Sequence, residues 1–141
     1  MLRVVLDTVV FVRSLINPHS KCGRIVFAHA GSYRLFISEP VAREIVEVLN
    51  RLELRRKFRS LVALDMRRAI ELLGQAELVE VDQPLRVSRD PNDDKFLATA
   101  AAAEADYLVT EDADLLVLEQ YAGTTILDAA AFLKELEASL Q

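Results

Sequence analysis

The chain has 141 residues, of which 52% are hydrophobic and 28% are charged, and its formal net charge is −5. This length suffices for one domain with a substantial core, and the composition is ordinary for a soluble globular protein. The single cysteine, Cys22, excludes an internal disulfide framework and a cysteine-based zinc site. No apolar run approaches the roughly 20 residues of a membrane span, and Met1 leads directly into a predicted strand. We therefore expect one cytoplasmic domain comprising residues 1–141.

The predicted elements alternate between strands and helices along the chain. Short runs of β-branched and other apolar residues indicate buried strands, and apolar residues at helical spacing indicate helices between them. This alternation predicts an α/β fold with three α/β/α layers, in which a largely parallel sheet of four or five strands lies between helices. The predicted elements are, in order, strand 3–6, helical stretches 9–16 and 23–30, strand 34–37, a helix after Ser38, a basic helical region to about Gly74, strand 78–81, helix 94–104, strand 107–109, helix 113–121, strand 124–127 and a last helix after Asp128.

Two of the predicted strands lead into acidic residues. Asp7 follows strand 3–6 directly, while Thr110, Asp112 and Asp114 follow strand 107–109. In open α/β sheets, ligands bind at the carboxyl ends of the strands, where these residues are expected to meet. Each acid also has a simpler interpretation, because Asp is a favoured helix cap and negative charge suits a helix N-terminus.

Two acids on predicted helices complete the set. Glu44 lies at the margin of the buried side of its helix and, taken alone, reads as a surface acid. Asp94 lies in the first turn of a helix and borders an apolar face, where a carboxylate is costly unless it is compensated. We favour a functional role for Asp94 over Asp93, because Asn92 or Asp93 can cap this helix. Because four converging carboxylates repel one another, the set of Asp7, Glu44, Asp94 and Asp112 calls for a divalent metal ion.

A basic segment interrupts this generally acidic chain. Residues 51–68 contain seven basic residues and two acidic ones. A run of charge often marks only a solvated helix face, but Leu and Phe residues accompany these charges. The mixture suits a protruding pair of helices that contacts a partner through apolar residues and phosphates through its cations. The candidate substrate-binding residues are Arg51, Arg55, Arg56 and Lys57.

The ordered acids and their surroundings resemble the PIN-domain family of nucleases, most closely the toxins of toxin–antitoxin pairs. The resembling segments are 4–12, 44–51, 90–98 and 105–116. The resemblance implies a PIN-like fold and a Mg²⁺- or Mn²⁺-dependent endoribonuclease that hydrolyses single-stranded RNA. The resemblance to these toxins implies an antitoxin partner, and the apolar residues of the basic segment suit contact with an antitoxin or a second copy, so we expect a homodimer or larger assembly. The implied catalytic residues are Asp7, Glu44, Asp94, Thr110 and Asp112, and the implied metal ligands are the four acids together with Asp114.

One position departs from the family pattern. Members usually have an Asn two residues after the first Asp, where it orders the site by hydrogen bonding, and here that position is Val9. A second hypothesis is therefore an RNA-binding or antitoxin-binding PIN module with impaired catalysis. A phosphoacceptor response-regulator domain would need a different order of acids and a late Lys. A nucleotide-binding Rossmann domain would need a Gly-rich turn after the first strand, which this sequence lacks.

Overall fold

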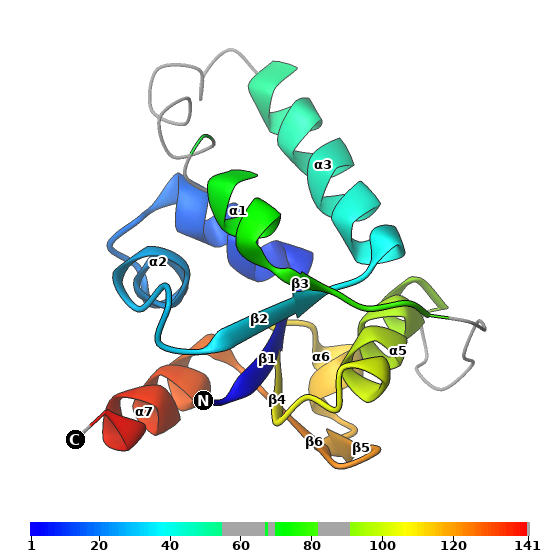
Figure 1. The fold of residues 1–141 in the computed structure, drawn as a ribbon. Helices are drawn as coiled ribbons and strands as arrows, with labels where there is room; N and C mark the ends of the chain where they lie inside the picture. Colours follow the sequence, from blue (N-terminus) through cyan, green and yellow to red (C-terminus); the bar gives the residue numbers. More distant parts are fainter. Residues whose placement is uncertain (55–66, 68–69, 82–90, 141) are drawn as a thin grey trace.

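The computed structural model describes residues 1–54, 67, 70–81 and 91–140. The described strands form one sheet with the order β3-β2-β1-β4-β6-β5 (Figure 1). All neighbours in this order pair in parallel except β5 and β6, which are antiparallel. The largely parallel sheet predicted from the sequence is confirmed, with six strands in the described residues where four or five were predicted. The strands are β1 (Arg3–Leu6), β2 (Arg34–Ile37), β3 (Glu77–Leu78), β4 (Tyr107–Val109), β5 (Gln120–Tyr121) and β6 (Thr124–Leu127).

The two central strands, β1 and β4, end at the same level of the sheet. Leu6 pairs with Val109, and the ladder continues because the Asp7 amide donates to the Val109 carbonyl at 2.9 Å. Both strands are apolar, and Val4, Val5 and Leu108 are fully buried. Apolar side chains on both faces are typical of a parallel strand covered by helices on both sides. The residues that follow β1 and β4 are therefore held side by side at the carboxyl edge of the sheet.

Helices cover both sides of the sheet. The described helices are α1 (Thr8–Ile16), α2 (Lys21–Gly23), the π-helical turn η1 (Arg24–Ala28), α3 (Glu39–Leu54), the 3₁₀ turn η3 (Pro91–Asp93), α5 (Asp94–Ala102), α6 (Ala113–Leu116) and α7 (Ala129–Ser139). Helix α5 contacts β1, β2 and β4, while α7 contacts β4 from the other side (Figure 1). The buried Phe132 of α7 packs edge-on against the rings of Tyr33 and Tyr107, with centroids 5.9 and 5.6 Å away. The fold therefore has three layers, with the sheet between two layers of helices.

Several predicted boundaries were wrong. The predicted helix 113–121 ends at Leu116, and the chain then forms the short strand β5. A hairpin turn with positive φ at Ala122 and Gly123 returns it to β6. The predicted strand 78–81 is the two-residue β3, which pairs only at Glu77 and Leu78. The predicted helix 23–30 is divided between α2 and the wider η1.

No helix in the described ranges is long and apolar enough to cross a membrane. Of the predicted substrate-binding residues, Arg51 lies exposed near the end of α3. Arg55, Arg56 and Lys57 lie outside the described residues.

Candidate active site

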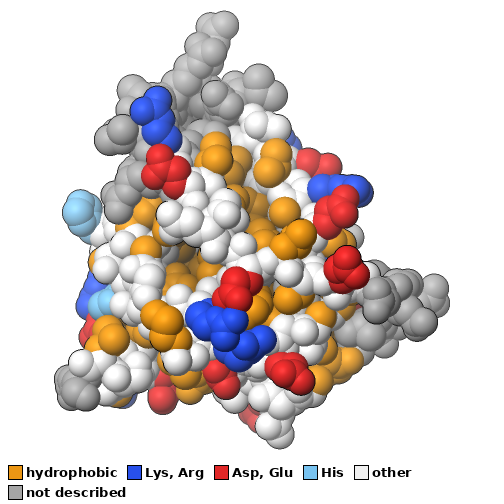
Figure 2. All heavy atoms as spheres, viewed as in Figure 1, with side chains coloured by type: hydrophobic (Ala, Val, Ile, Leu, Met, Phe, Trp, Pro, Cys, Tyr) orange, Lys and Arg blue, Asp and Glu red, His pale blue; other side chains and the backbone are white. Residues whose placement is uncertain are grey.

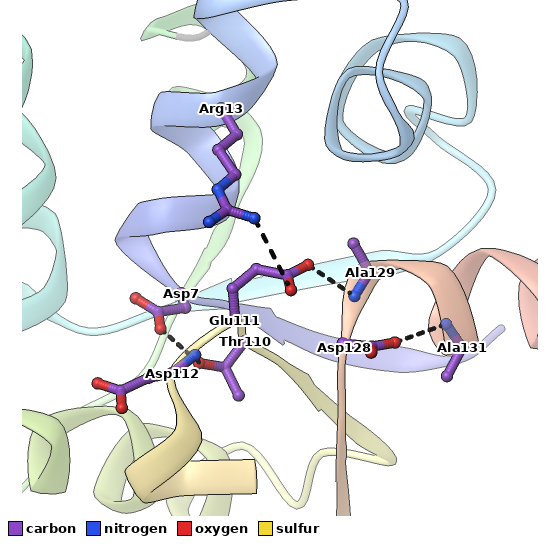
Figure 3. Close-up of polar contacts among 8 residues, drawn as sticks. All are labelled: Asp7, Arg13, Thr110, Glu111, Asp112, Asp128, Ala129 and Ala131. Atoms are coloured by element: carbon purple, nitrogen blue, oxygen red, sulfur yellow. Dashed lines mark hydrogen bonds and ion pairs between the residues drawn. The ribbon is translucent and has the colours of Figure 1, made fainter.

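The site begins with a hydrogen bond between the ends of the two central strands. Asp7 and Thr110 are both buried, and the Thr110 hydroxyl donates to Oδ2 of Asp7 at 2.6 Å. The same hydroxyl oxygen accepts from the Asp112 amide at 3.0 Å. Figure 3 shows Asp7, Thr110 and Asp112 gathered at this edge of the sheet. The convergence predicted for these residues is therefore present in the fold.

Asp7 and Asp112 also begin helices. Asp7 is the N-cap of α1 and accepts from the Val9 amide at 3.3 Å, and Asp112 is the N-cap of α6 and accepts from the Asp114 amide at 2.8 Å. An N-cap uses one carboxylate oxygen and leaves further lone pairs available. The capping interpretation is thus correct for both residues and is compatible with a role in the site.

Three carboxylates lie close enough together to share a cation. Oxygens of Asp93, Asp112 and Asp114 lie within 4.8 Å of one another. Opposite oxygen ligands of Mg²⁺ are about 4 Å apart, so this set fits a hard divalent ion with little rearrangement. Asn92 or Asp93 was expected to cap α5, but the Asp93 side chain makes no capping hydrogen bond to that helix. Asp93 is therefore a candidate ligand in addition to the acids predicted from the sequence.

Asp94 occupies the first turn of α5, as predicted, and only 4% of its surface is exposed. It does not belong to the group of three carboxylates formed by Asp93, Asp112 and Asp114. Two consecutive buried acids therefore open α5. Asp93 approaches the acids that follow β4, while Asp94 remains a ligand candidate from the resemblance.

Glu44 reaches the site from α3 and is held by two neighbours. The Thr8 hydroxyl donates to its Oε2, and the Lys95 ammonium donates to its Oε1 at 2.8 Å. The side chains of Glu44 and Lys95 are 26% and 25% exposed, so this ion pair is half-buried. Neither Thr8 nor Lys95 was singled out in the sequence. A lysine in the first turn of a helix interacts unfavourably with the helix dipole, and this is the feature of the sequence that could have indicated a special role for Lys95.

The surroundings of Asp7 disfavour its charged form. Burial raises the pKa of the Asp7 carboxyl, the hydrogen bonds from Thr110 and the Val9 amide lower it, and the nearby carboxylates of Glu44 and Asp112 raise it further. The net pKa lies above the ordinary value of 3.8. A bound cation would relieve this repulsion, because it favours the ionised form of every acid around it.

Glu111 points away from this cluster. Figure 3 shows its side chain directed from the end of β4 toward Arg13 and the start of α7. Its Oε1 accepts from the Ala129 amide at 3.1 Å, and its Oε2 lies 3.9 Å from the Arg13 guanidinium. Glu111 therefore bridges α1 and α7, whereas the side chains of Asp7 and Asp112 lie on the other side of the end of β4 (Figure 3).

The exposed Val9 stands in the first turn of α1, where its amide donates to Asp7. Its side chain is 39% exposed, so it is accessible at the rim of the site. Figure 2 shows acidic and basic side chains interspersed with apolar ones over the visible described surface.

Comparison with known proteins agrees with this fold. The model of the PIN domain family matches residues 3–114. No curated protein sequence matches the chain. The fold is similar to that of PAE2754 from Pyrobaculum aerophilum, with 16% identity, a TM-score of 0.61, and coverage of 97% of this chain and 90% of that one.

Two VapBC structures are also similar. DNA-bound VapBC from Salmonella typhimurium has 16% identity and a TM-score of 0.54, and the match covers 92% of this chain and 99% of that one. VapBC2 from Rickettsia felis, bound to a DNA fragment from its promoter, has 15% identity and a TM-score of 0.53, with coverage of 90% and 98%. These likenesses concern the fold. Together with the family match over most of its length, they lead to one conclusion: the chain belongs to the PIN-domain family.

Proposed function

We propose that this chain is a Mg²⁺- or Mn²⁺-dependent endoribonuclease that hydrolyses single-stranded RNA. The observation that carries the proposal is the meeting of Asp7, Asp93, Asp112 and Asp114 at the carboxyl edge of β1 and β4 in a PIN fold. A cluster of oxygen donors at this edge suits a hard divalent cation and, through it, a phosphodiester.

The acids divide into two groups as candidate ligands. Asp93, Asp112 and Asp114 already have mutually close oxygens, and Asp7 lies beside them through its link to Thr110. Glu44 and Asp94 complete the ligand set that the family resemblance implies. Bound among these residues, a divalent ion would supply a more acidic water and offset the charge that develops on the phosphate.

The protein's own residues prepare this site. Thr110 fixes the carboxylate of Asp7, and the Asp114 amide fixes that of Asp112. Lys95 partly neutralises Glu44, which limits repulsion between α3 and the strand ends. Because these partners are mostly backbone groups and short side chains, the acids are held before any substrate arrives.

We further propose that the protein is the toxin of a toxin–antitoxin pair and forms a homodimer or larger assembly. The similarity of its fold to two VapBC structures supports an antitoxin partner. The basic residues Arg51, Arg55, Arg56 and Lys57 are the proposed contacts to RNA phosphates, since the net charge of −5 alone would repel a polyanion.

Val9 favours a second candidate function, an RNA-binding or antitoxin-binding module with impaired turnover. One assay separates the two. Single-stranded RNA is incubated with the purified protein in Mn²⁺ or in EDTA, and the charge-neutral Asp112→Asn variant is tested beside it. Cleavage that requires Mn²⁺ and is lost in Asp112→Asn supports the nuclease. RNA binding without cleavage under any divalent metal would contradict it and favour the impaired module.

A further inference from the structure

A cavity of about 520 Å³ lies beside the acidic cluster, between the end of α1, α2 and the start of α7. Its volume falls within the range of about 300–1,000 Å³ that is usual for small-molecule sites. Its lining includes Arg13, Ile16, Lys21, Glu111, Asp128 and Ala130, so two acidic and two basic residues face it. These residues come from separate parts of the chain, so the cavity is a product of the tertiary fold.

The cavity and the acidic cluster share a wall. Glu111 lines the cavity, and its chain neighbours Thr110 and Asp112 belong to the cluster. Since Glu111 points toward Arg13 and α7 while Asp112 lies on the side of Asp7 (Figure 3), the two sites occupy opposite sides of one short stretch of backbone. A nucleic-acid strand with a phosphate at the cluster would have to pass over the end of β4 to place another of its nucleotides at the cavity.

The lining offers three kinds of contact that a nucleotide can use. Apolar surface comes from Ile16 and Ala130, against which the flat face of a base can pack. The carboxylate of Glu111 is anchored by the Ala129 amide and accepts hydrogen bonds. The exposed cations of Arg13 and Lys21 are suited to the phosphate groups of the backbone.

We propose that this cavity binds a nucleobase of the same single-stranded RNA whose backbone the acidic cluster engages; the inference rests on the proposed function of the acidic cluster. The carboxylates of Glu111 and Asp128 on its wall select bases with an exocyclic amino group, because Glu and Asp accept from such donors. Adenine and cytosine are preferred over uracil, which lacks an amino group. Arg13 and Lys21 hold the flanking phosphates.

Filling the cavity tests the proposal. Ala130 and Ala131 are adjacent and exposed in the first turn of α7, but only Ala130 lines the cavity. Binding of short labelled oligonucleotides of adenine, cytosine or uracil is measured by fluorescence anisotropy in Ca²⁺. We expect Ala130→Phe to weaken binding of the adenine and cytosine oligonucleotides about tenfold, and the matched control Ala131→Phe to leave it unchanged.

Glu111→Gln provides a second test of base selection. Glutamine keeps an acceptor for the Ala129 amide but loses the negative charge. We expect the preference of the wild type for adenine and cytosine over uracil to shrink severalfold in this variant, while the exposed control Glu135→Gln retains it.

Two results would overturn the base-binding site: equal binding of all three oligonucleotides by the wild type, or unchanged affinity in Ala130→Phe. The nuclease proposal is judged separately. If RNA is cleaved but Ala130→Phe has no effect, the base-binding site is wrong and the nuclease stands. If base-selective binding is lost in Ala130→Phe but no metal supports cleavage, the cavity assignment stands and the nuclease is wrong.

Discussion

The Thr110 hydroxyl donates to Asp7 at 2.6 Å across 103 residues of sequence, and thereby links the ends of β1 and β4. The same oxygen accepts from the Asp112 amide, so one fully buried side chain positions two acids of the candidate site. Hydrogen-bond partners of metal ligands orient the ligands and affect metal affinity. Thr110 is therefore expected to act as a positioning residue rather than as a ligand.

Replacing Thr110 by valine keeps the shape of the side chain and removes this hydroxyl. We expect Thr110→Val to weaken Mn²⁺ binding by about tenfold, as is typical when an outer partner of a ligand is lost. The free energy of unfolding should fall by about 1–2 kcal/mol, because buried hydrogen-bonding groups lose their partner. Calorimetric Mn²⁺ titration and urea denaturation measure the two effects. Thr110→Ser, which keeps the hydroxyl, should retain most of the affinity, and equal losses in both variants would contradict the positioning role.

The raised pKa of Asp7 makes the stability of the metal-free protein depend on pH. Between the ordinary value of 3.8 and the raised pKa, the folded protein binds more protons than the unfolded chain. Stability contributed by this group is therefore lost as pH rises through that window. Asp7→Asn removes the buried charge. In EDTA at neutral pH, its melting temperature should therefore be higher than that of the wild type, and this difference should disappear below pH 3.8.

Mn²⁺ should reverse that order. The ion stabilises the folded state of the wild type by mass action, whereas Asp7→Asn binds it weakly. Thermal melts of both proteins with Mn²⁺ and with EDTA check this. A wild type that is more stable than Asp7→Asn in EDTA at neutral pH would show that the carboxylates are not repelling one another.

The neighbouring acids Asp93 and Asp94 allow a paired test of the ligand set. Because the Asp93 oxygens lie within 4.8 Å of those of Asp112 and Asp114, we expect Asp93→Asn to weaken Mn²⁺ binding at least as much as Asp94→Asn. The expected loss for Asp93→Asn is on the order of tenfold or more, since a ligand contributes more than its outer partners. Mn²⁺ titration compares the metal affinities of the two variants, and Glu135→Gln controls for the removal of one negative charge. Unchanged affinity in Asp93→Asn would remove this residue from the site.

Val9 is the residue that motivates the hypothesis of a module with impaired catalysis. It is 39% exposed in the first turn of α1, so an Asn side chain fits there without filling the core. We expect Val9→Asn to raise the rate of Mn²⁺-dependent RNA cleavage severalfold, because the amide can order the site by hydrogen bonding. Val9→Leu is the apolar control and should not raise it. Equal rates in the wild type and Val9→Asn would show that Val9 imposes no limit on turnover.

Most of the sheet could be predicted because its strands are continuous apolar runs. Strand β5 could not, since its hairpin turn is Ala122-Gly123 rather than a pair such as Asn-Gly. The φ of Ala122 is 50°. Nothing in the sequence indicates a positive φ at this alanine. The residues of 113–121 also have helical spacing, and tertiary pairing with β6 prevails over that local preference.

The candidate site was predictable where it follows strand ends and less so where it enters from helices. Asp7 and Asp112 come directly after the central strands, so the parallel pairing of β1 with β4 brings them together. The choice between Asp93 and Asp94 depends on how the η3 turn enters α5, and sequence spacing does not determine that angle. Lys95 was missed because its partner, Glu44, lies 51 residues away on α3.

The position of a bound metal ion is the most direct test of the proposed metal site. A crystal of the protein soaked in Mn²⁺ gives an anomalous signal at each manganese site. We expect manganese among Asp7, Asp93, Asp112 and Asp114 at the carboxyl edge of β1 and β4, and loss of that signal in Asp112→Asn. A fully soaked crystal with no manganese between Asp7 and Asp112 would contradict it.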